Sequence, residues 1–122
     1  MIAAITNIIG ETLHLSTEEA QNTKDVLINA LDQEHRILFW NKKAEEYFGI
    51  DKNSAIGHRL EDIIPSTRTN EKMMHLRRAL AGTPVHIAKD RYERTYGYYE
   101  QWILPVKKEG IIVAALNIVR DI

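Results

Sequence analysis

The sequence contains no cysteine. Disulfide bonds, thiol nucleophiles, thiolate metal sites and chemistry through a cysteine adduct are therefore excluded. A chain without disulfides suits a reducing compartment, and we expect a cytoplasmic protein.

The sequence also lacks an excess of charge of one sign and any long apolar run. Its 16 Lys and Arg residues nearly balance 17 Asp and Glu residues, for a formal net charge of −1, whereas binding to nucleic acid calls for a basic face. No apolar run approaches the roughly 20 residues that cross a bilayer, and the first fifteen residues lack the features of a signal peptide. We expect no nucleic-acid partner and no direct membrane insertion.

Recognisable catalytic motifs are missing as well. The sequence has no phosphate-binding loop, nucleophile elbow or dinucleotide-binding fingerprint. Its five histidines are scattered. His58 and Glu61 are spaced to share one helix face, but two ligands do not make a metal site. We predict neither catalytic nor metal-binding residues, so the chain itself is not expected to be an enzyme.

The N-terminal residues follow a helical pattern. Four aliphatic residues recur at steps of three and four and predict an amphipathic helix: Ile2, Ile5, Ile9 and Leu13. The run Ser16-Thr17-Glu18-Glu19 matches a capping box, which predicts a second short helix. We assign residues 1–24 to a helical cap or dimerisation segment and residues 25–122 to a single domain.

The order of elements in residues 25–122 predicts an α+β fold. Polar residues between two apolar runs predict a hairpin, and Asn41 and Gly49 suit the start and the end of a helix. Asn70 is the predicted cap of a longer helix. The expected elements are strands over 25–31 and 35–40, helices over 42–48, 53–57, 60–64 and 71–81, and strands over 84–93, 97–106 and 110–120.

The residues in this order resemble a PAS domain. The first half of the resemblance lies in Ala30-Leu31-Asp32, Ile37 to Asn41, Ala44, Phe48-Gly49, Ile56-Gly57 and Ile63-Ile64-Pro65, and the second half in Trp102 to Pro105 and Gly110 to Ile122. The resemblance implies a five-stranded antiparallel sheet with short helices on one face, here with an added N-terminal amphipathic helix. It also implies a sensory role, in which a signal passes to a C-terminal output domain beyond Ile122, such as a histidine kinase. Asp121 would be a signal-transfer residue, a helix N-cap at the domain exit, or both.

The resemblance makes flavin and haem candidate cofactors, and the sequence disfavours both. Flavin photosensors of the LOV subclass need a cysteine between Gly57 and Ile64, and none is present, so that only noncovalent flavin binding stays open. Haem-binding relatives carry a histidine where His75 lies. On a helix, His75 falls about 135° from the centre of the apolar stripe formed by Met73, Leu76 and Leu80, and we expect it to face water. The ligand stays unknown, and a cleft filled by side chains would hold none.

Strand alternation, aligned through Pro105 with the proline of the family, predicts the lining of a cleft. It places Phe39, Tyr99, Gln101 and Asn117 in the lining, and Tyr47, Ile56 and Met73 of the predicted helices complete the set of candidate residues. Gln101 and Asn117 are polar groups in an apolar cleft and need partners. They bond each other, the backbone or a water, or they orient a ligand.

The same alternation places apolar residues on the opposite face of the sheet. They are Leu38, Trp40, Tyr98, Trp102, Leu104, Leu116 and Ile118. The run from Ile111 to Val119 is almost continuously apolar, which is typical of a strand buried on both faces. An outer face of this kind needs a cover. We expect a homodimer formed through the N-terminal helix and the outer face, including Trp40 and Trp102.

Three functions remain open at this point. The leading one is a sensory domain that binds a small ligand or mediates dimerisation and signals to an output domain. The alternatives are a ligand-free protein-interaction domain and, less favoured, a haem-binding gas sensor. A small enzyme or carrier on a similar scaffold would need a catalytic constellation that the sequence does not display.

Overall fold

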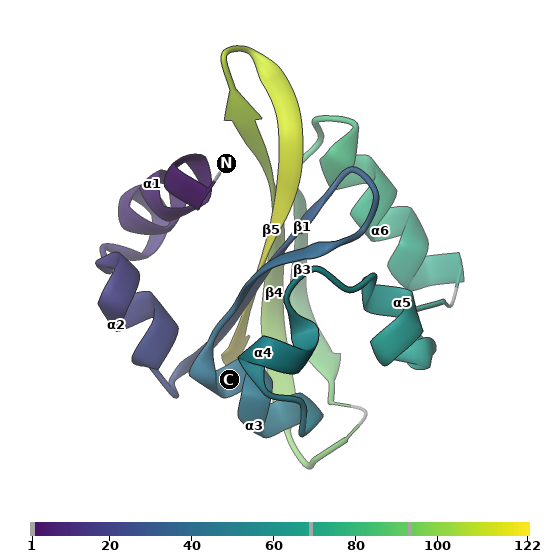
Figure 1. Cartoon of the computed structure of the whole chain (residues 1–122). Coiled ribbons are helices and arrows are strands. Elements are labelled where there is room, and N and C mark those ends of the chain that lie inside the picture. The colour runs from purple at the N-terminus through teal and green to yellow at the C-terminus, as the bar shows by residue number, and fades with distance from the viewer. Residues whose placement is uncertain (1, 69, 93) are drawn as a thin grey trace.

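A five-stranded antiparallel sheet forms the centre of the molecule (Figure 1). The computed structural model describes residues 2–68, 70–92 and 94–122. The strand order is β2-β1-β5-β4-β3. The strands are β1 (Val26–Asp32), β2 (Ile37–Trp40), β3 (Val85–Arg91), β4 (Tyr98–Lys108) and β5 (Ile111–Asp121). The predicted fold class is confirmed.

Helices cover both faces of this sheet (Figure 1). On the face that we call outer lie α1 (Ile2–Leu13) and α2 (Thr17–Asn22). On the inner face lie α3 (Lys42–Phe48), α4 (Lys52–Ala55), α5 (Leu60–Ile63), the 3-10 helix η1 (Pro65–Arg68) and α6 (Asn70–Leu80). Within the described ranges, no helix is long and apolar enough to cross a membrane.

The predicted elements match these bounds to within a few residues. Met1 and Glu93, at the ends of two predicted elements, lie outside the described residues, as does the side chain of Asn70 with its predicted cap. The capping box is present, because Ser16 Oγ accepts from Glu19 N while Glu19 Oε1 accepts from Ser16 N.

Asn41 caps α3 and also joins three elements from a fully buried position. Its Oδ1 accepts hydrogen bonds from Ala44 N at 3.1 Å and from Ile28 N at 3.0 Å. Its Nδ2 donates to Val26 O at 2.7 Å and to Ala20 O at 3.0 Å. One amide therefore ties α2, β1 and α3 together, where the sequence indicated a cap alone.

Strand β5 contributes to two separate hydrophobic cores. Ala115 and Val119 belong to the inner core, whereas Ala114, Leu116 and Ile118 belong to the outer core. Each face of β5 is covered, which accounts for the unbroken apolar run of its sequence. The outer cover is α1, whose Ile5 and Ile9 are fully buried against the sheet.

The alternation predicted for β2 is wrong at the end of the strand. Its pairing with β1 shifts between Ala30, which faces Phe39, and Leu31, which faces Ile37. This bulge inserts one residue and breaks the period of two. Phe39 therefore packs in the outer core, not toward the cleft.

Trp40 is the second consequence of the bulge. It is fully buried in the inner core, where its Nε1 donates a hydrogen bond to Ile50 O at 3.0 Å. Trp40 therefore cannot belong to an interface on the outer face. Trp102 does lie on the outer face, partly buried beside the outer core.

Replacing Asn41 by Ala is expected to lower the free energy of unfolding by about 3 kcal/mol. The change removes a helix cap and leaves buried backbone groups of Ile28, Val26 and Ala20 without their partner. Urea denaturation followed by circular dichroism measures the difference.

The matched control is Ser16→Ala, which removes the exposed cap of α2. It should cost about 1 kcal/mol, because water can replace the lost hydrogen bond. Equal losses in the two variants would show that Asn41 acts as an ordinary cap.

Candidate ligand-binding site

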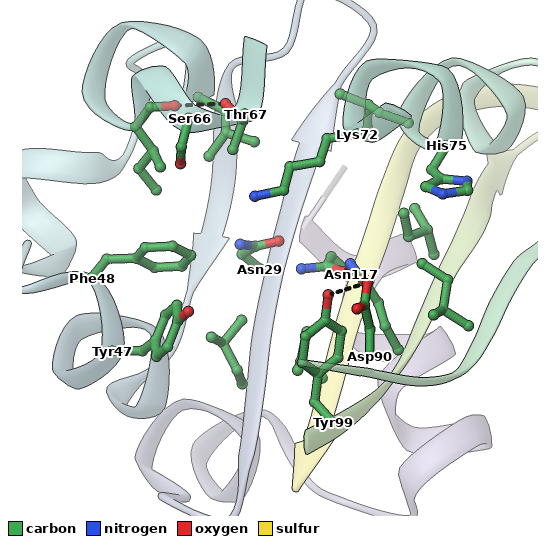
Figure 2. Close-up of a pocket in the computed structure, with 18 of the residues that line it drawn as sticks. Asn29, Tyr47, Phe48, Ser66, Thr67, Lys72, His75, Asp90, Tyr99 and Asn117 are labelled. Carbon is green, nitrogen blue, oxygen red and sulfur yellow. Dashed lines mark hydrogen bonds between the residues drawn. The ribbon is translucent and has the colours of Figure 1, made fainter. Parts of the chain in front are cut away.

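A cavity of about 470 Å³ lies between the inner face of the sheet and the helices above it (Figure 2). This volume falls in the range of pockets that hold small organic ligands. Much of the lining is aliphatic and comes from β1, β4, β5 and the helical segment: Leu27, Leu31, Leu60, Ile64, Leu76, Ile103 and Val119. The pocket therefore favours a ligand with an apolar body.

Three amide side chains cross the floor of the pocket on neighbouring strands. Asn29 of β1 lies directly opposite Asn117 of β5, and Gln101 of β4 donates from Nε2 to Asn117 Oδ1 at 2.6 Å. Figure 2 shows Asn29 and Asn117 side by side below the cavity. The predicted inward orientation of Gln101 and Asn117 is confirmed, and of the alternatives considered for their partners the structure shows a hydrogen bond between the two side chains.

One wall of the pocket is a chain of aromatic rings. Ring centroids are 4.9 Å apart for Tyr47 and Phe48, 5.4 Å for Tyr47 and Tyr92, and 5.0 Å for Tyr92 and Tyr99. The Tyr92 hydroxyl donates a hydrogen bond to a carboxylate oxygen of Asp121 at the end of β5. Burial, and then this bond to an anion, raise the pKa of Tyr92. Its hydroxyl therefore stays protonated and acts as a donor.

His75 of α6 lines the pocket, and its expected orientation toward water is wrong. The side chain is only 19% exposed, and Nδ1 is buried without a hydrogen-bond partner among the described residues. Its Nε2 lies 3.9 Å from Glu71 Oε1. The helical-geometry argument against haem therefore loses its premise.

The reason lies in which residues of α6 turn toward the sheet. Ala79 is fully buried, and Lys72 lines the pocket. These two residues move the centre of the buried face away from Met73 and Leu80, so that His75 comes to its edge. Alanine and lysine do not stand out in a pattern of large aliphatic residues. The apolar stripe deduced from the sequence was therefore centred away from the helix face that packs on the sheet.

Five of the seven predicted cleft residues line the pocket: Tyr47, Met73, Tyr99, Gln101 and Asn117. Phe39 lies on the other side of the sheet. Ile56 is 38% exposed and does not line the pocket, because the short helix α4 ends at Ala55, which takes the inward position.

Sequence reasoning missed Asn29, Lys72 and Tyr92. Asn29 offered a signal, since a lone polar residue within the apolar run of residues 27–31 requires a reason. Tyr92 offered none, because it lies between β3 and β4, where the chain path cannot be read from periodicity.

Comparisons with known proteins agree on the fold. The sequence profile of the family described as PAS fold matches residues 22–122. Among curated protein sequences, none matches the chain.

Several solved structures are similar to this one. The PAS domain of histidine kinase ThkA superposes with a TM-score of 0.66 at 24% identity, covering 79% of this chain and 98% of that chain. The PAS domain of BvgS from Bordetella pertussis gives 0.71 at 17% identity, covering 99% and 85%. A sensory box sensor histidine kinase from Vibrio cholerae gives 0.68 at 16% identity, covering 95% of each chain. At such identities the likeness concerns the fold.

The amide pair on the pocket floor should show strong energetic coupling. Asn117→Leu alone is expected to cost about 1 kcal/mol of unfolding free energy, because Gln101 loses its acceptor. Gln101→Met alone should cost a similar amount for the converse reason. The double variant should lie close to the native protein, since both polar groups are gone. Additive losses, measured by urea denaturation of all four proteins, would contradict the coupling.

Proposed function

The chain belongs to the PAS family, and from this premise we propose that its pocket binds a small molecule and that the end of β5 passes the signal to an output domain. A PAS domain of this kind, like those of histidine kinases, is a sensory module. In this proposal the output domain, for instance a histidine kinase, performs the chemistry. The observation that carries the proposal is the pocket itself, with apolar walls and a row of amides on its floor.

The hydrogen bond between Tyr92 and Asp121 supports the signalling part of the proposal. Tyr92 belongs to the aromatic wall, and Asp121 is the last residue of β5. Lys43 Nζ of α3 lies 3.8 Å from the other carboxylate oxygen of Asp121. A ligand that displaces the wall therefore acts directly on the residue at which the chain leaves the sheet.

A pocket that binds a ligand predicts a thermal shift. We expect at least one compound of a metabolite library to raise the melting temperature of the chain by several degrees, since a ligand at a hundred times its Kd adds about 2.7 kcal/mol. The variant Ala115→Leu, which places a larger side chain into the pocket, should lose the shift.

Other outcomes would assign the pocket differently. A library without any active compound would favour the ligand-free interaction domain. A Soret absorption band of the purified protein that disappears in His75→Ala would identify haem as the ligand, and an unchanged band in that variant would speak against coordination by His75.

We also propose that the chain forms a homodimer through its outer side. Ile5 and Ile9 of α1 are already buried within the chain, so the interface would use the remaining surface of α1, where Ile2 is 50% exposed, and the adjoining sheet around Trp102. Trp40 takes no part. Sedimentation at micromolar concentration should give a dimer that Ile2→Ser weakens. A monomer at every concentration would show that α1 serves as a lid only.

A further inference from the structure

Asn29 is a buried amide that faces the pocket from the middle of β1. It is only 3% exposed, and Figure 2 shows its side chain on the floor of the cavity. Within the part of the chain that the structure describes, this side chain has no hydrogen-bond partner. A buried amide is almost always hydrogen-bonded, so a ligand in the pocket can supply the partner of Asn29.

The polar groups next to Asn29 differ from it, because they bond one another. Asn117 lies directly opposite on β5 and accepts from Gln101 Nε2 at 2.6 Å. Asp90 and Tyr99 lie beside Asn117 (Figure 2), and Tyr99 Oη donates to Asp90 Oδ2 at 3.3 Å. Among the described residues of the pocket floor, Asn29 is therefore the amide that a ligand is needed to satisfy.

The charged side chains that line the pocket have partners or reach water. Asp90 accepts a second hydrogen bond, from Arg91 N at 2.8 Å, and the side chain of Arg94 donates to a backbone carbonyl of α3 at 3.4 Å. Arg91 is exposed, as is 78% of the Glu71 side chain, and Lys72 has an interaction of its own. These charges do not call for a counter-ion within the pocket, which favours an uncharged ligand.

An aromatic ring lies near the amide of Asn29. Asn29 pairs with Trp40 across β1 and β2, and the rings of Trp40 and Phe48 have centroids 5.2 Å apart. Phe48 lines the pocket, and in Figure 2 its ring points toward Asn29. A ligand ring that packs on Phe48 therefore brings a substituent carried on that ring to the amide.

A carboxamide is the substituent that complements Asn29. The Asn29 side chain offers an acceptor, Oδ1, and donors on Nδ2, side by side in one plane. A ligand carboxamide presents a donor and an acceptor in the same arrangement, so that two hydrogen bonds form together. A carboxylate would instead place a negative charge against Oδ1, and an amidinium would place its N–H groups against Nδ2.

We propose that the ligand of this pocket is an uncharged aromatic carboxamide and that Asn29 selects it. The carboxamide pairs with the Asn29 side chain, and the aromatic ring packs on Phe48. A cavity of about 470 Å³ has room for a fused bicyclic ring. This inference rests on the proposed function, because it names the ligand class of the same pocket.

Three probes that share a naphthalene ring, substituted at the same position, test the ligand class. Naphthamide is uncharged and offers a donor and an acceptor, acetonaphthone is uncharged and only accepts, and naphthoate is anionic and only accepts. Isothermal titration calorimetry on the purified chain should show naphthamide binding about tenfold more tightly than either of the others, because each of them lacks one of the two hydrogen bonds.

Leucine variants of two opposed residues separate Asn29 from the rest of the pocket floor. Asn29→Leu should raise the melting temperature of the unliganded chain by a few degrees, because a buried amide without a partner is removed. It should also abolish the preference for naphthamide over acetonaphthone. Asn117→Leu is the matched control, because Asn117 lies opposite Asn29 and has a partner. It should lower the melting temperature and keep the preference for naphthamide.

Several outcomes would overturn this ligand class. Naphthamide might bind no more tightly than naphthoate or acetonaphthone, or fail to bind. Asn29→Leu might lower the melting temperature at least as much as Asn117→Leu, which would show that water or the chain already satisfies the Asn29 amide. If compounds from the metabolite library still shift the melting temperature of the chain, only the ligand class has failed. If none does, the proposed function has failed with it.

Discussion

The buried amide of Asn41 is the interaction on which the arrangement of this fold depends. It accepts from the backbone of β1 and α3 and donates to the backbone of α2 and β1. Without it, several backbone groups at the junction of these elements would be buried without partners, at a cost of about 1–3 kcal/mol each. The amide thus fixes where α2 meets the sheet on one face and where α3 starts on the other. The placement of the helices on the outer face and the placement of the aromatic residues in the pocket both depend on these two junctions.

The second constraint is that the central strands of the sheet are buried on both faces. Because α1 covers the outer face with Ile5 and Ile9, the inner face does not have to supply the whole hydrophobic core. The inner face can therefore hold a cavity and carry Asn29, Gln101 and Asn117 on three neighbouring strands. A sheet with one core only could not place three amides at its centre without losing much of its apolar burial.

Local signals in the sequence predicted the elements well, and relations between elements less well. Caps such as Asn41 and the capping box at Ser16 act within four residues, so the sequence displays them directly. The bulge that turns Phe39 outward and Trp40 inward depends on how β1 pairs with β2, which no local pattern contains. The position of His75 depends on how α6 rests on the sheet, and small Ala79 decides that without an apolar signal. The amide pair was found because strand alternation is reliable where β4 and β5 pair without a shift, as they do around Gln101 and Asn117.

In the proposed function, the direction of signalling would follow from how the two sides of the sheet are held. On the outer side, α1 packs through fully buried aliphatic residues, which tolerate little displacement. On the inner side, the aromatic wall includes Tyr92, whose hydroxyl makes one hydrogen bond to the exposed residue Asp121 at the end of β5. A single bond near solvent exchanges for water at low cost, whereas a packed helix does not. A ligand that pressed on Tyr47 or Tyr99 would therefore move Tyr92 against Asp121 before it moved α1. In the proposed function, the end of β5 is therefore the position where occupancy of the pocket would change the structure first.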